Sequence, residues 1–132
     1  MDIFERRSLL ATERNPDSKL DYVITITGQI AAHREPDSSS INLRYVPDKV
    51  ILQPVSFGRY LDALGTVDWT ALEEVAAAVL NDVNNELIAR WVQVGISAPG
   101  QTHLGIDRHE VLLEDHQPNW ENAGLLSRLK RH

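Results

Sequence analysis

The stretch TALEEVAAAVLNDVNNEL, residues 70–87, carries the clearest periodic pattern in the sequence. Its apolar residues recur at helical spacing and form a single stripe: Leu72, Val75, Ala76, Val79, Val83 and Leu87. Thr70 and Glu73 have the spacing of a capping box, in which two side chains bond the first free amides of a helix. The pattern predicts an amphipathic helix that begins near Thr70 and buries one face.

The segments around this helix predict an antiparallel sheet. Apolar and β-branched residues are concentrated in four stretches that we expect to be strands: residues 20–27, 40–46, 90–97 and 102–113. Another helix is expected from Pro54, a residue tolerated in a first helical turn, to about Leu64. The order strand, strand, helix, helix, strand, strand implies an α+β domain with one antiparallel sheet and both helices on one face.

The length of 132 residues suits one domain with its own core. We expect this domain over residues 20–113, between an N-terminal arm over 1–19 and a C-terminal tail over 114–132 that contains a short helix. The arm has three apolar residues that we expect to anchor it: Phe4, Leu9 and Leu10.

The composition excludes several classes of function. No cysteine is present, so disulfides, cysteine-rich zinc sites and thiolate nucleophiles are excluded. The net charge of −6 argues against a nucleic-acid partner, which requires clustered basic residues. No apolar run approaches the roughly 20 residues of a membrane span, and the first residues do not have the pattern of a signal peptide. We therefore expect a cytoplasmic protein without nucleic-acid or membrane partners.

Seven short stretches carry a resemblance to a known family through their order and near-constant spacing. They are Asn15-Pro16 with Leu20-Asp21-Tyr22, Glu35-Pro36-Asp37, Tyr45-Val46-Pro47-Asp48, Ser56 with Tyr60, Glu73, Leu80-Asn81-Asp82 and Arg90-Trp91-Val92. Together they cover about residues 15–108 and resemble the NADPH-dependent 7-cyano-7-deazaguanine reductases of queuosine biosynthesis. That family has the tunnelling fold (T-fold), in which sheets join across subunits, so the resemblance implies a ring-shaped homo-oligomer.

The resemblance implies roles for two polar residues, and a third candidate lies in the same loop as one of them. The family uses a Cys nucleophile, an Asp proton donor and a Glu that binds the guanine-like edge of the substrate. Glu73 matches the substrate-binding Glu and Asp37 matches the proton donor. His33 lies in the same loop as Asp37 and is a candidate acid–base group, since an unperturbed histidine titrates near neutral pH. Each has an alternative reading: helix capping for Glu73, turn formation for Asp37 and a solvated loop position for His33.

The reductive chemistry of the family is not expected here. The position of the family's Cys falls near Ile30, and the two lysines of its cofactor motif read as Val55 and Gly58. Loss of two cations removes the charge that binds the phosphates of NADPH. We therefore expect no cofactor and no thioimide-based nitrile reduction.

His103, Asp107 and His109 would share one face of a regular strand over residues 102–113, a pattern that invites a metal site. The first two would then lie about 13 Å apart and could not share an ion. The remaining two ligands are too few for a closed zinc site, so we expect no metal.

Two functions remain open from the sequence. The first is a T-fold protein that binds a purine-like, deazaguanine-like or pterin-like heterocycle at a subunit interface through Glu73. The second is a non-catalytic structural or partner subunit that keeps only the T-fold oligomer.

Overall fold

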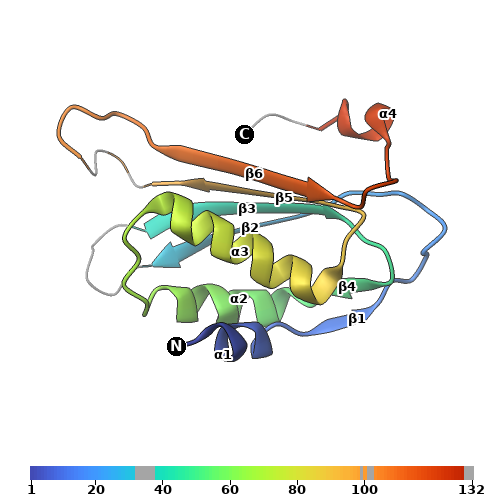
Figure 1. Cartoon of the computed structure of the whole chain (residues 1–132), viewed down its shortest axis with the longest axis horizontal. Helices are drawn as coiled ribbons and strands as arrows, with labels where there is room; N and C mark the ends of the chain where they lie inside the picture. The colour runs from blue at the N-terminus through green and yellow to red at the C-terminus, as the bar shows by residue number, and fades with distance from the viewer. Residues whose placement is uncertain (32–37, 99, 101–102, 130–132) are drawn as a thin grey trace.

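The computed structural model describes residues 1–31, 38–98, 100 and 103–129, which form two antiparallel sheets and four helices (Figure 1). The main sheet has the strand order β2-β3-β5-β6: β2 (Ile24–Ala31), β3 (Ser38–Val46), β5 (Trp91–Ser97) and β6 (Glu110–His116). The smaller sheet contains β1 (Thr12–Arg14) and β4 (Val50–Leu52). The helices are α1 (Ile3–Ser8), α2 (Pro54–Leu64), α3 (Leu72–Leu87) and α4 (Ala123–Leu126).

The two long helices cover one face of the main sheet. Figure 1 shows α2 and α3 on the same side of this sheet, whereas α4 lies beyond its opposite face. Helix α3 contacts β5 and β6, and α2 contacts β2. The expected α+β architecture, with an antiparallel sheet and both predicted helices on one face, is confirmed. Within the described ranges, none of the helices has the length and apolarity needed to cross a membrane.

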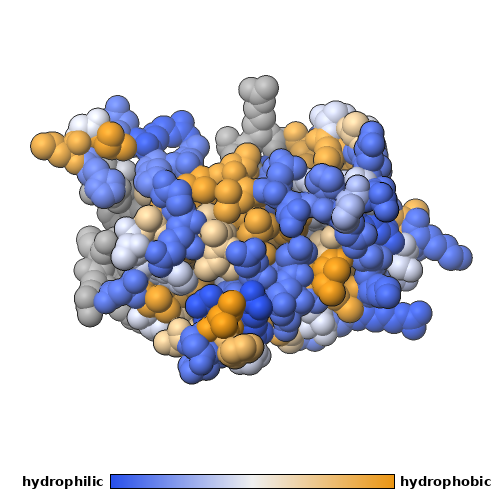
Figure 2. Space-filling view, viewed as in Figure 1, coloured by the Kyte–Doolittle hydropathy of each residue, from blue (hydrophilic) through white to orange (hydrophobic). Residues whose placement is uncertain are grey.

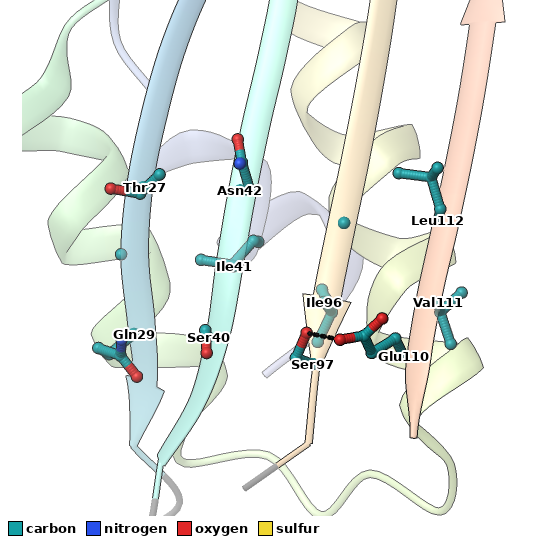
Figure 3. Close-up of a pocket in the computed structure, with 12 residues that line it drawn as sticks. Thr27, Gln29, Ser40, Ile41, Asn42, Ile96, Ser97, Glu110, Val111 and Leu112 are labelled. Atoms are coloured by element: carbon teal, nitrogen blue, oxygen red, sulfur yellow. Dashed lines mark hydrogen bonds between the residues drawn. The ribbon is translucent and has the colours of Figure 1, made fainter. Parts of the chain in front are cut away.

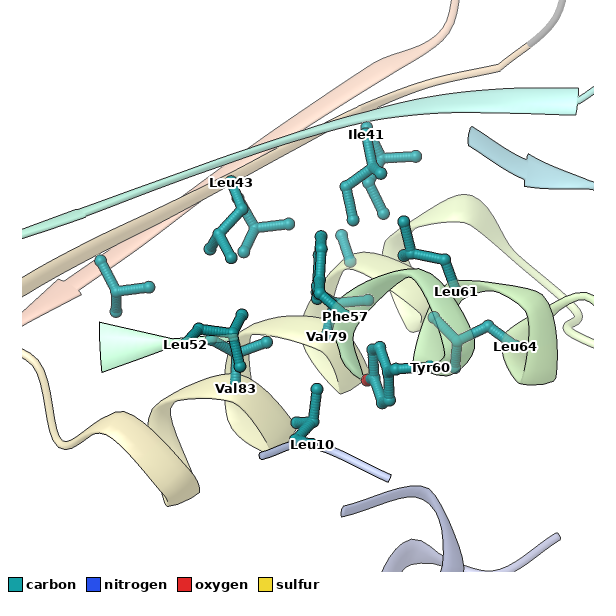
Figure 4. Close-up of a cluster of buried hydrophobic side chains, with 14 of the residues drawn as sticks. Leu10, Ile41, Leu43, Leu52, Phe57, Tyr60, Leu61, Leu64, Val79 and Val83 are labelled. Atoms are coloured by element: carbon teal, nitrogen blue, oxygen red, sulfur yellow. The ribbon is translucent and has the colours of Figure 1, made fainter. Parts of the chain in front are cut away.

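Alternation along the strands determines which side chains enter the core. On β3, Ile41, Leu43 and Tyr45 face the helices and are almost fully buried. Figure 4 shows Ile41 and Leu43 above Phe57 of α2 and Val79 of α3. Complete burial of a large apolar side chain contributes about 1.5–3 kcal/mol. The apolar stripe of α3 and the matching face of the sheet therefore fix the two layers against each other.

The other set of alternating residues forms the open face of the main sheet. Ser40 and Asn42 of β3 lie directly across from Ser97 and Gly95 of β5. Ser97 in turn pairs with Glu110 on β6. Around Ser40 and Asn42 this face is polar, and Gly95 there has no side chain. Farther along the same face lie the buried side chains of Val46 and Trp91.

The sequence predicted the helices better than their caps. Helix α2 begins and ends as predicted, and α3 ends at Leu87. The predicted capping box is wrong, because Ala71 is the N-cap residue and makes no side-chain cap. Thr70 instead donates a hydrogen bond from its hydroxyl to Glu74 Oε2, at 2.6 Å. Glu73 is therefore not committed to a capping box with Thr70.

Two strands and the N-terminal arm differ from expectation. The strand expected over 102–113 is wrong in its bounds, because the chain turns through Gly105 (φ +80°) and β6 begins only at Glu110. The strand expected over 20–27 begins at Ile24 and continues to Ala31. In the arm, Leu10 is buried and Leu9 packs against the core, but Phe4 is 78% exposed and does not anchor it.

A buried carboxylate joins three helices. Asp82 of α3 is fully buried and accepts hydrogen bonds from Arg6 Nε at 2.9 Å, Arg7 Nε at 3.0 Å and the Tyr60 hydroxyl at 2.6 Å. Burial and the neighbouring carboxylate both raise the pKa of Tyr60, so this hydroxyl stays protonated as a donor. The guanidinium of Arg6 also lies over the Trp69 ring, 5.7 Å from its centroid. Asp82 therefore holds α1 against α2 and α3.

Replacement of Asp82 by Asn should destabilise the protein by about 3 kcal/mol, because two partly buried guanidinium groups lose their counter-ion. Urea denaturation followed by tryptophan fluorescence measures this change. The matched control is Asp62→Asn on the exposed side of α2, which should shift the free energy of unfolding by less than about 0.5 kcal/mol. Equal stability of the two variants would contradict the anchoring role of Asp82.

Helix α3 ends in a strained residue. Ile88 has a left-handed backbone (φ 44°, ψ 54°), and its side chain branches at Cβ, which makes this conformation unfavourable. It is also 65% exposed, so little packing compensates.

Ile88→Gly should stabilise the fold by roughly 0.5–1 kcal/mol, because relief of the strain exceeds the larger chain entropy that glycine adds to the unfolded state. Ile88→Ala is the control, since alanine keeps the Cβ and most of the strain. Thermal unfolding of both variants tests this, and a glycine variant no more stable than the alanine variant would refute it.

Candidate functional site

Glu73 lies in the first turn of α3, at the end of the helix that adjoins the start of β6. Its side chain is 64% exposed, and its Oε2 atom lies 3.4 Å from His109 Nε2. His109 directly precedes β6, and Ala98 donates a backbone hydrogen bond to its carbonyl at 2.9 Å. The helix start and the β5–β6 hairpin thus bring the two side chains together at the edge of the sheet.

Local contacts keep the Glu73 carboxylate ionised. Its own backbone amide is the main cause that lowers the pKa of Glu73, and the neighbouring His109 lowers it further. Because the side chain is 64% exposed, solvent or a ligand can still reach the carboxylate. The arrangement therefore presents a hydrogen-bond acceptor at the surface.

A hollow of about 640 Å³ lies elsewhere, on the open face of the main sheet (Figure 3). Its polar lining includes Ser40, Asn42 and Ser97, and Ser97 donates a hydrogen bond to Glu110 at 3.4 Å. Gly95 leaves the centre of this face without a side chain. Glu73 does not line this open-face hollow. A glycine inside a strand pattern is the sequence signal for such a place.

The two proposed catalytic residues, Asp37 and His33, lie outside the described residues. In the chain they belong to the segment that joins β2 to β3. Their proposed roles therefore stay predictions from the sequence.

Most of the motif residues shared with the reductase family are engaged in structural contacts. Tyr60 and Asp82 bind each other beneath α1. Asn15 binds the Tyr22 hydroxyl through Oδ1 and the Asp48 carbonyl through Nδ2, at 2.5 and 2.8 Å. These residues hold the N-terminal arm and the turn after β3 in place.

A second motif cluster is centred on Arg90. Its guanidinium binds the carboxylates of Asp21 and Asp48, at 3.0 and 3.3 Å, and the carbonyls of Ser18 and Leu20. This network ties the arm to the start of β5. The contacts of Arg90, Asp21 and Asp48 therefore have a structural role in holding the arm.

Two positions of α2 correspond to the lysines of the resembled family's NADPH motif. Val55 is exposed, and a side chain at Gly58 would meet no other atom within 4 Å. Neither residue carries a charge, whereas Arg59, which follows Gly58, is exposed. The expectation that NADPH does not bind stays a prediction from the sequence. Among the described residues, no group of three potential metal ligands lies together.

Figure 2 shows an apolar tip on the loop that projects before β6. Leu104 and Ile106 are exposed in this loop. His103 is exposed as well, whereas His109 at the end of the loop contacts Glu73 of α3. As a metal ligand, His109 was a candidate from the sequence, but its contact with Glu73 was not predicted.

The comparisons with known proteins support the fold. No family model and no curated protein sequence matches the chain. Among solved structures, the chain is similar to the crystal structure of the archaeosine synthase QueF-Like in the apo form, at 19% sequence identity. The match covers 73% of this chain and 93% of that chain, with a TM-score of 0.55. The chain thus has the T-fold that its sequence motifs imply.

Proposed function

We propose that this chain binds a planar heterocycle of the guanine, deazaguanine or pterin type at the interface of a T-fold homo-oligomer. Support comes from the fold, which the chain shares with an archaeosine synthase, and from the family motifs. In this proposal Glu73 recognises the ring edge. The observation that carries it is the exposed, ionised carboxylate of Glu73 beside the edge strand β6.

The chemistry of a carboxylate suits such a ring. A 2-amino-4-oxo heterocycle presents a ring N–H and an exocyclic amine side by side, and the two carboxylate oxygens accept both in parallel. Charge-assisted pairs of this kind are shorter and stronger than neutral hydrogen bonds. The lowered pKa of Glu73 favours the proposal, because a protonated carboxyl group would lose one of the two acceptors.

The sheet topology supports an interface at this place. Strands β2 and β6 are the two edges of the main sheet, and neighbouring strands run antiparallel throughout it. The β2 strand of a second copy would continue the same pattern beside β6. A ligand at Glu73 would then lie where two subunits meet.

The proposed function does not include nitrile reduction. Attack on a nitrile carbon requires a strong nucleophile, and the chain has no cysteine to form a thioimide. If the bound heterocycle is turned over, we assign acid–base chemistry to Asp37, which matches the family motif, or in second place to His33 in the same loop.

The second candidate is a structural or partner subunit. It is favoured by the contacts of the shared motif residues, most of which hold the fold together. In that case the Glu73 carboxylate binds its own amide and His109, and has no ligand.

Calorimetric titration with guanine, 7-cyano-7-deazaguanine and a pterin separates the two candidates. Binding should weaken at least about 30-fold in Glu73→Gln, because an amide cannot accept both N–H groups. Glu74→Gln is the matched control: it removes the same charge from the same helical turn and should bind like the unmodified protein. Absence of binding to all three compounds, or equal binding by Glu73→Gln, would assign the chain to the structural candidate.

A further inference from the structure

His109 and Glu73 form a donor–acceptor pair although 36 positions separate them in the chain. We infer that His109 is a specificity-determining residue, which donates an N–H to the ring carbonyl of the heterocycle whose two N–H groups Glu73 accepts. This inference rests on the proposed function and names the second half of the same recognition site.

The backbone of His109 is held on two sides. The Ala98 amide binds its carbonyl at 2.9 Å, and the next residue, Glu110, pairs with Ser97 in the β5–β6 ladder. The side chain is only 32% exposed, half the exposed fraction of Glu73. The imidazole therefore starts from a defined position, and little ordering is needed when a ligand binds.

The imidazole of His109 is only loosely bound to Glu73. The Glu73 carboxylate lies 3.4 Å from Nε2, which is long for a hydrogen bond. Arg108 and Glu110 flank His109 in the chain, and these two side chains form an ion pair with each other. A ligand that offers a better acceptor can therefore take the N–H of His109 without breaking a strong contact.

The order of groups on the pair matches one type of ring edge. Glu73 supplies two acceptors, and the Nε2–H of His109 supplies an adjacent donor. A guanine or pterin edge presents an amine, a ring N–H and a carbonyl oxygen in sequence, which is the complementary order. Glu73 and His109 together should therefore prefer rings in which a strong acceptor lies next to the ring N–H and the exocyclic amine.

A comparison of guanine with 6-thioguanine tests the proposed hydrogen bond from His109 to the ring carbonyl separately from the contacts of Glu73. Both keep the amine and the ring N–H that Glu73 accepts, but the carbonyl oxygen of guanine is replaced by sulfur, a weak acceptor. If His109 only balances the charge of Glu73, its removal should weaken both ligands alike. If it donates to the carbonyl, its removal should weaken guanine selectively.

Calorimetric titration of the full chain with both compounds tests the inference. We expect guanine to bind about 10-fold or more tightly than 6-thioguanine, and this ratio to fall to within about 2-fold in His109→Ala. His109→Gln, which retains an N–H donor, should keep part of the preference. His103→Ala removes an exposed histidine from the same loop and should leave the ratio unchanged.

The outcomes distinguish the inference from the proposed function. If guanine binds and Glu73→Gln abolishes binding, but His109→Ala keeps the original ratio, the role of His109 is overturned and the heterocycle site stands. If the unmodified protein binds neither compound, both fail. Selective loss of guanine affinity in His109→Ala, with His103→Ala unchanged, supports both.

Discussion

The packing of the apolar stripe of α3 against alternate residues of the main sheet is the constraint on which the rest of the structure depends. Once Ile41 and Leu43 enter the core, the period of two in a strand forces Ser40 and Asn42 onto the open face. The same packing sets α3 along β5 and β6, so that the helix start meets the beginning of β6. The position of Glu73 beside the sheet edge is therefore a consequence of core packing.

The buried carboxylate of Asp82 gives part of the motif pattern a structural explanation. Tyr60 and Asp82 hold α1 on the long helices, and Arg90 holds the arm near β5. Loss of such groups would leave buried charges without partners, which is costly in any T-fold protein of this design. In contrast, Val55 is exposed, and a side chain at Gly58 would meet no other atom within 4 Å, so packing does not determine the residue at either position.

The spacing of apolar residues in the sequence predicts the helix and sheet layers, but it does not predict the contacts between segments that are distant in the chain. The stripe from Leu72 to Leu87 predicted α3, because burial of one helix face leaves a local signal. The capping box pairs Thr70 with Glu73 at a spacing of three, whereas the hydrogen bond forms with the neighbouring Glu74 at a spacing of four, and the sequence pattern does not distinguish these two glutamates. The contact of Glu73 with His109 had no signal at all, because it depends on where the hairpin loop ends and β6 begins.

Glu73 and the open-face hollow lie in different places, so a heterocycle could be bound at only one of them. Glu73 stands at the sheet edge, whereas the open-face hollow is lined by residues such as Asn42 and Ser97. A crystal structure of the protein grown with guanine tests the account most directly. We predict a ring whose amine and ring N–H face the Glu73 carboxylate, between β6 of one subunit and its neighbour. Guanine bound in the open-face hollow, or a monomer with no ligand at Glu73, would contradict the account.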